Sequence, residues 1–225
     1  MAKQTINIGS SANDGTGSTL REAFDICNDN FTEIYGGTNT AFQFKAEGTN
    51  FTGSLLIGHA TTGTISSAEN NTGVGISALD ALTEGDYNVA LGFEAATALT
   101  AGSFNVILGS RAGKALTTGI HNVAVGYAAL RTEDTGDKNV AVGYAALNAL
   151  NYDGDGYNVA VGHSAGTAVT TGTLNTVVGG SAGDALTTGN YNTALGYDAL
   201  SAEDAGSANT AIGALTLAQQ DAGAD

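Results

Sequence analysis

A repeat of seventeen residues dominates this chain of 225 residues. Each copy has an asparagine, a short and mainly apolar run, and a glycine four residues after the asparagine. The repeat asparagines are Asn71, Asn88, Asn105, Asn122, Asn139, Asn158, Asn175, Asn192 and Asn209, in steps of 17 except for one of 19. Such a unit is too short for a helix pair or a propeller blade, but it suffices for one coil of a β-solenoid. We therefore predict an all-β fold, a parallel β-solenoid with 17-residue coils.

The apolar run of each copy predicts a short strand. Its first and third residues are Val, Thr, Leu or Ile, as in Val89 and Leu91, and its second is usually alanine, as in Ala90. Since strand side chains alternate between faces, both faces are apolar, which is typical of a strand buried on both sides. We expect one face to pack inside the coil and the other, through its small residues, to approach an identical chain.

Other columns of the repeat indicate structural roles. An alanine seven residues after the asparagine and a Leu or Val eleven residues after it are expected to form the second wall of a thin coil. The asparagines are expected to form a hydrogen-bonded ladder between coils. A second glycine, such as Gly102, marks a turn where we expect positive φ. Counting a degenerate first copy at 54–58, ten coils at about 4.8 Å give a rod roughly 50 Å long.

The repeats divide the chain into three parts: residues 1–47, the rod at 48–215, and a polar cap or tail at 216–225. A helix is predicted at about 19–35, because Thr19 and Glu22 form a capping box and Gly36 ends the pattern. Its apolar residues are spaced as in a coiled coil and are expected to serve trimerisation and anchoring. They are Leu20, Phe24, Cys27, Phe31 and Ile34.

Charge and apolar content restrict the partners. The net charge is −15, from 22 acidic and 7 basic residues. Phosphate backbones and anionic lipid surfaces repel such a chain, so we expect no nucleic-acid partner. The N-terminus lacks the apolar stretch of a signal peptide, and no window is apolar enough to span a bilayer. We therefore expect synthesis in a cytoplasm and no membrane insertion.

The two-residue insertion marks a candidate binding loop, because insertions in solenoids bulge from one face. The loop residues are Tyr152, Asp153, Asp155 and Tyr157. The two aspartates match part of a calcium loop, but the other ligands are missing, so we expect no metal. An aromatic column that includes Tyr87 and Phe104 is consistent with sugar stacking or with packing between coils.

Acidic residues gather in the turns. They are Asp80, Glu84, Asp86, Glu133, Asp134, Asp137, Asp153, Asp155, Glu203 and Asp204. Paired carboxylates beside a sugar groove would make a glycosidase, whereas scattered ones keep a repetitive rod soluble. We favour solubility, and we expect no catalytic residues and no cofactor.

Two resemblances add to this reading. The unit from Asn122 to Leu130, Asn-Val-Ala-Val-Gly-Tyr-Ala-Ala-Leu, resembles the head repeats of trimeric autotransporter adhesins, and the likeness covers about residues 54–215. It implies a left-handed parallel β-roll with three chains side by side. Residues 13–17, 20–24 and 28–35 look like a motif near the start of phage tail-fibre and other virion proteins. That motif is expected to attach the protein to the particle.

Together the resemblances imply a short homotrimeric fibre of a bacteriophage virion, on the tail, neck or baseplate. It would be made in the bacterial host cytoplasm, be anchored to other virion proteins through residues 1–47, and aid host adhesion. An autotransporter would need a signal peptide, a stalk and a membrane anchor, and we find none of these in the sequence. The alternatives are an adhesin that recognises host surface glycans through its turns, and a tailspike that degrades polysaccharide.

Overall fold

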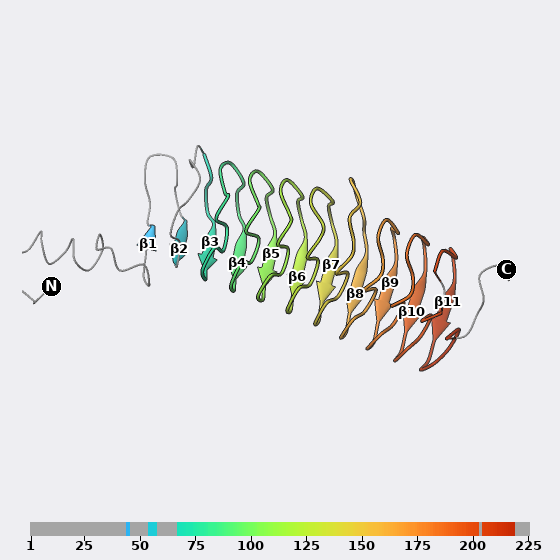
Figure 1. The fold of residues 1–225 in the computed structure, drawn as a ribbon. Coiled ribbons are helices and arrows are strands. Elements are labelled where there is room, and N and C mark those ends of the chain that lie inside the picture. Colours follow the sequence, from blue (N-terminus) through green and yellow to red (C-terminus); the bar gives the residue numbers. More distant parts are fainter. Residues whose placement is uncertain (1–43, 46–53, 58–66, 203, 219–225) are drawn as a thin grey trace, which may run out of the picture.

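The computed structural model describes residues 44–45, 54–57, 67–202 and 204–218. They form a parallel β-solenoid of about nine turns, which confirms the predicted coil architecture. The coils follow one another along the rod in sequence order, so that β2 and β11 lie at opposite ends (Figure 1). The described residues contain no helix. The predicted helix at 19–35 and most of the predicted tail lie outside them.

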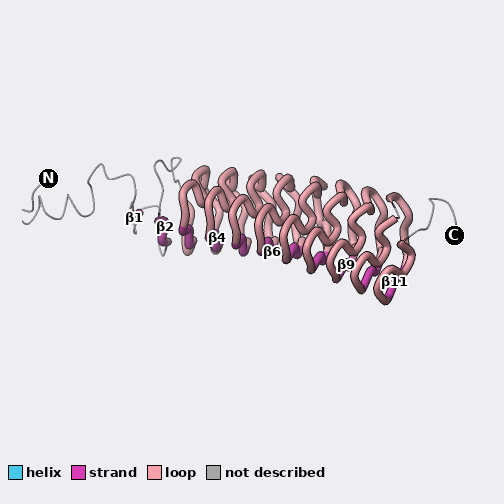
Figure 2. Tube along the Cα trace, turned by 60° about the horizontal axis from the view of Figure 1, so that its bottom comes forward, coloured by secondary structure: helices cyan, strands magenta, loops and turns pink. Residues whose placement is uncertain are grey.

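Each coil contributes one short strand to a single sheet with the order β1 to β11. β1 pairs with β2 antiparallel, and every later neighbouring pair is parallel. The strands lie in one row along one side of the rod, and turns form the rest of each coil (Figure 2). Their bounds are β1 Phe44–Lys45, β2 Leu55–Ile57, β3 Thr72–Val74, β4 Val89–Leu91, β5 Val106–Leu108, β6 Val123–Val125, β7 Val140–Val142, β8 Val159–Val161, β9 Thr176–Val178, β10 Thr193–Leu195 and β11 Thr210–Ile212.

The sheet register repeats the sequence register. Val89 pairs with Val106, and Val106 pairs with Val123, each 17 residues on. The degenerate copy contributes a strand in the same register, because Leu55 pairs with Thr72, 17 residues on. Only the pair Val140 and Val159 is 19 residues apart, so the insertion is absorbed in a turn and not in the sheet.

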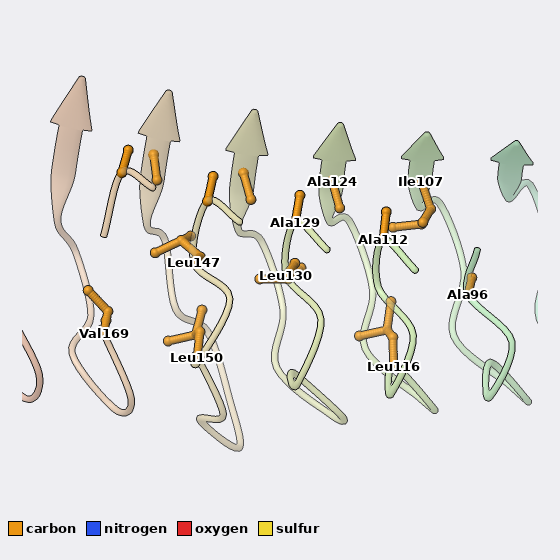
Figure 3. Packing of buried hydrophobic residues seen from close by; sticks show 14 of the residues in the cluster. Ala96, Ile107, Ala112, Leu116, Ala124, Ala129, Leu130, Leu147, Leu150 and Val169 are labelled. Atoms are coloured by element: carbon orange, nitrogen blue, oxygen red, sulfur yellow. The ribbon is translucent and has the colours of Figure 1, made fainter. Parts of the chain in front are cut away.

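The interior of the rod is thin and apolar. The middle residue of each strand points inward, as Ile107 and Ala124 do toward Ala112 and Ala129 of the opposite wall (Figure 3). These residues are completely buried. The prediction that the small middle residues approach a second chain was therefore wrong. The coil is narrow, and the larger middle residue Ile107 fits beside Gly113, where a Cβ would lie 3.2 Å from the Ile107 side chain. The first and third residues of the strands point outward and are half-buried or exposed.

The turns depend on left-handed backbone at residues other than glycine. Besides the glycine four residues after the asparagine, three positions of each coil have positive φ: the residue before the asparagine and those six and eight residues after it. In the coil of Asn105 they are Phe104, Arg111 and Gly113, with φ of 60°, 60° and 51°. Left-handed conformation costs a non-glycine residue roughly 1–2 kcal/mol. Since most coils contain at least two such residues, the bonds between coils must offset a cost that recurs along the rod.

The two glycine columns require glycine for different reasons. Gly126 has φ of +130°, and a Cβ there would lie 2.6 Å from the carbonyl carbon of Gly143 in the next coil. Gly102 does not have the positive φ that we expected of its column. Its Cβ would instead lie 2.7 Å from the Leu99 side chain, so lack of space excludes a larger residue.

The repeat asparagines form a ladder through the rod. From Asn88 to Asn209, the backbone N–H of each repeat asparagine donates to the side-chain oxygen of the repeat asparagine in the preceding coil, at 2.9–3.2 Å. Most of the side-chain amides also donate to the carbonyl of the turn glycine fourteen residues on, as Asn88 does to Gly102 at 2.8 Å. Asn71 to Asn192 are buried, and Asn209 is partly exposed. The ladder thus satisfies polar backbone groups that water does not reach.

Replacing one ladder residue should destabilise the rod. Asn122→Ala removes the acceptor for the Asn139 N–H and the donor to the Gly136 carbonyl. Because both groups are left unpaired, we expect a loss of about 3 kcal/mol in the free energy of unfolding by denaturant. The control, Asn148→Ala, removes one bond from a half-buried amide and should cost about 1 kcal/mol or less. Equal losses in the two variants would contradict a structural role for the ladder.

Candidate functional site

An apolar surface follows the outward face of the sheet. It consists of the first and third residues of the strands, which repeat along the rod. Leu91, Val106 and Leu195 on this face are 40%, 38% and 48% exposed, and Ile212 at its end is 64% exposed. Within the single chain, this face of a parallel sheet therefore remains partly open to solvent.

Aromatic side chains stand at both ends of the strands. The leading column is the residue before each repeat asparagine, and the trailing column is the residue five positions after it. In the leading column, Phe104 stacks between Tyr87 and His121, with ring centroids 5.1 and 5.2 Å apart. In the trailing column, Tyr144 stacks between Tyr127 and His163 at 5.3 and 4.9 Å.

The rings in these two stacks pack on one another between coils. They lie at the surface and not in the core, since Tyr87, Phe104, Tyr127 and Tyr144 are all about half exposed. A sugar stacks on the face of an aromatic ring. Because the faces of Phe104 and Tyr144 are already covered by their neighbours, packing explains these two stacks better than sugar binding does.

The trailing column has no ring at Ser110, and the cationic side chain of the next residue, Arg111, lies there instead. The guanidinium of Arg111 lies over the Phe93 ring, 5.9 Å from its centroid, and Arg111 also interacts with the Tyr127 side chain. Its Nε lies 3.1 Å from the Glu94 carboxylate, which the Lys114 amine approaches at 2.8 Å. The hydrogen bond from Lys114 holds the pKa of Glu94 below its ordinary value. A planar cation thus takes the place of a missing ring.

The predicted binding loop is fastened to the coil before it. The Thr135 hydroxyl donates to Asp153 at 2.8 Å, and the Lys138 amine lies 2.7 Å from Asp155 and 5.0 Å from the centroid of the Tyr157 ring. The hydrogen bond from Lys138 lowers the pKa of Asp155. Tyr152, Asp153, Asp155 and Tyr157 all lie at the surface of this one turn, but both carboxylates already have partners within the chain.

The structural role of Glu133 is the feature of this region that the sequence interpretation missed. Glu133 occupies the column in which other coils have Leu116 or Leu150, and it is completely buried. The prediction that it is a surface residue for solubility was therefore wrong. A departure from the leucine column just before the only 19-residue step was the signal that could have identified it.

The buried carboxylate of Glu133 compensates for the insertion. In the coil of Asn88, the N–H groups of Thr100, Ala101 and Gly102 all donate to the Thr117 carbonyl of the next coil. In the coil before the insertion, Glu133 Oε1 accepts instead from the backbone N–H groups of Asp134 and Gly136, at 3.1 and 2.7 Å. Its Oε2 accepts from the Tyr152 N–H at 3.2 Å. A side chain has thus replaced a backbone acceptor.

No family model, curated protein or solved structure matches this chain. Within the described ranges, no three His, Cys, Asp or Glu side chains are grouped so that they could hold a metal ion. A search of the same residues finds no helix with the length and apolar character needed to cross a membrane.

The burial of Glu133 predicts a pH dependence. Burial raises its pKa above the ordinary value of 4.5. A raised pKa in the folded state favours the protonated carboxyl, so its stabilisation is complete below the unfolded pKa and decreases as the pH rises through the folded pKa. Relative to Glu133→Gln, the wild type should therefore lose stability as the pH rises above the ordinary carboxyl pKa of 4.5. Denaturant unfolding of both proteins at a series of pH values measures this difference, and parallel curves would contradict it.

Proposed function

We propose that this chain is a structural fibre protein of a bacteriophage particle, with a homotrimeric rod anchored through residues 1–47. The observation that carries the proposal is the outward apolar face, which runs along the rod and is left uncovered by the single chain. The role is mechanical and not enzymatic: a stiff spacer that projects from the particle and aids adhesion to the host.

The outward face supports association between identical chains. Parallel sheets are normally covered on both faces, and soluble monomers rarely expose a long contiguous apolar patch. A second copy offers the same residues at the same 17-residue spacing, so its face matches along the whole length. Closed rotational symmetry then limits the number of chains. The number three comes from the resemblance of the repeat to trimeric adhesin heads.

The bonding inside each coil supports a stiff spacer. A continuous hydrogen-bonded sheet and the buried asparagine ladder both run along the rod axis. Bending the rod would stretch bonds in every coil on one side. The assignment to a virion rests on the N-terminal motif, whose residues lie outside the described ranges.

The association can be tested by light scattering. The wild type should have a mass near three times 22.3 kDa. Leu91→Asp combined with Val106→Asp places two charges on β4 and β5 of the outward face, where burial in an interface would be costly. We expect this variant to be a folded monomer by mass and circular dichroism. Thr171→Asp, on an exposed turn, is the matched control and should remain trimeric. A monomeric wild type would overturn the trimer.

The anchoring claim needs a separate experiment in the phage. Deletion of residues 1–47 should abolish incorporation into particles, while the purified rod stays folded, because the attachment motif lies in the deleted segment. Particle composition measured by mass spectrometry, with the full chain as control, gives the result. A deleted chain incorporated at the wild-type level would rule out anchoring through this segment.

A further inference from the structure

Four columns of the repeat share the outward side of the rod. Burial alternates along each strand segment: in the coil of Asn105, Phe104 and Val106 are 51% and 38% exposed, whereas Asn105 and Ile107 are completely buried. Side chains of an extended segment alternate between its two sides. The leading column, the first and third strand residues and the trailing column therefore form one surface, which we call the four-column face.

The four-column face contains no carboxylate. Between residues 70 and 214, none of the 22 acidic residues of the chain falls in these columns, and Lys138 is the only Lys or Arg in them. Carboxylates begin one residue outside the face, as at Asp86 before the leading column and at Asp198 after the trailing column. Charged residues are depleted and aromatic residues enriched where proteins bury surface against one another. The sharp boundary thus marks all four columns, rings included, as a surface for burial.

The rings at both edges of this face are exposed in the single chain. Tyr191 and Tyr197, at the two ends of β10, are 65% and 61% exposed, and Tyr87 and Phe93, at the ends of β4, are 53% and 44% exposed. Soluble monomers rarely expose a contiguous apolar patch that runs the length of the molecule. Burial of the strand residues alone would leave these rings in water, so the edges need a partner as well.

Rotation about an axis parallel to the rod brings the two edges together. Such a rotation leaves height along the axis unchanged, so each coil lies level with the same coil of the neighbouring chain. When the four-column faces point toward the axis, the leading edge of one face meets the trailing edge of the next. Antiparallel chains would instead place one leading column against another.

We propose that the ring columns form the seams between neighbouring chains, with the leading column of one chain packed against the trailing column of the next in the same coil. Leu174 then lies level with the partner's Gly180, the smallest residue of the trailing column. Lys138, the one cation of the face, pairs with Asp155 of its own chain at 2.7 Å, so its burial leaves no unpaired charge. This inference rests on the proposed association of identical chains and specifies the contact by which they associate.

Cross-linking of the full chain tests the seam, in a variant with Cys27→Ser, Leu174→Cys and Gly180→Cys. Within one chain the two new cysteines are separated by six residues of extended segment, about 20 Å, which a short bismaleimide linker does not span. Between chains the two cysteines would be level and adjacent. Gly180→Cys suits the fold, because Gly180 does not have positive φ and an added Cβ makes only ordinary contacts.

We expect covalent trimers on a denaturing gel from this variant. Leu174→Cys or Gly180→Cys alone, each with Cys27→Ser, should remain at the mass of one chain. Linkage through Leu174→Cys alone, as antiparallel chains would give, would overturn the seam. Trimers by light scattering without any linked species would also overturn the seam but leave the association standing, whereas a monomeric wild type would overturn both.

A matched pair of charges provides a second test. Gly180→Glu places a carboxylate inside the seam, and Ser181→Glu places one just outside it, in the column where Glu94 and Asp198 occur naturally. Gly180→Glu should raise the concentration at which the chains dissociate, measured by light scattering, at least about tenfold, because its charge would be buried between chains. Ser181→Glu should change that concentration by less than about twofold. Equal effects in two variants that are folded by circular dichroism would exclude the seam.

Discussion

Hydrogen bonding between successive coils is the constraint on which the rest of this structure depends. A three-residue strand has no stability alone, and each coil also contains left-handed turn residues that are unfavourable by themselves. Stacking at a constant 17-residue offset pairs each strand with both neighbours and places each asparagine below the next. The same offset brings backbone so close at Gly126 that no side chain fits there. A coil therefore forms only together with the coils beside it, as expected of a solenoid.

The insertion shows how the fold tolerates a break in that regularity. Two extra residues leave the sheet pairing of Val140 and Val159 intact, but they change the turn that receives hydrogen bonds from the previous coil. Glu133 supplies the missing acceptors at the cost of a buried carboxylate in a leucine column. Lys138 and Thr135 hold the enlarged turn at the surface. The turn is thus a fastened part of the rod, which weakens the case for a free binding loop.

The outer surface repeats with the same 17-residue period as the interior. Its columns of rings are interrupted at a few positions. A regular column of rings or apolar residues gives the same contact in every coil and suits association along the rod. Ser110 interrupts the trailing column, and the guanidinium of the next residue, Arg111, lies over the Phe93 ring instead.

The sequence alone determined the solenoid, its coil length, the strand positions and the spacing of the ladder residues, because a strict repeat allows one stacking register. It did not determine which strand face points inward: alternation gives two apolar faces, and only the narrow interior places Ile107 and Ala124 inside and Leu91 outside. It also did not reveal the positive φ of residues such as Phe104, whose side chains carry no signal for it. The role of Glu133 likewise depends on a neighbour one coil away, because its Oε2 accepts from the Tyr152 N–H, 19 positions on. This contact exists only once the coils are stacked.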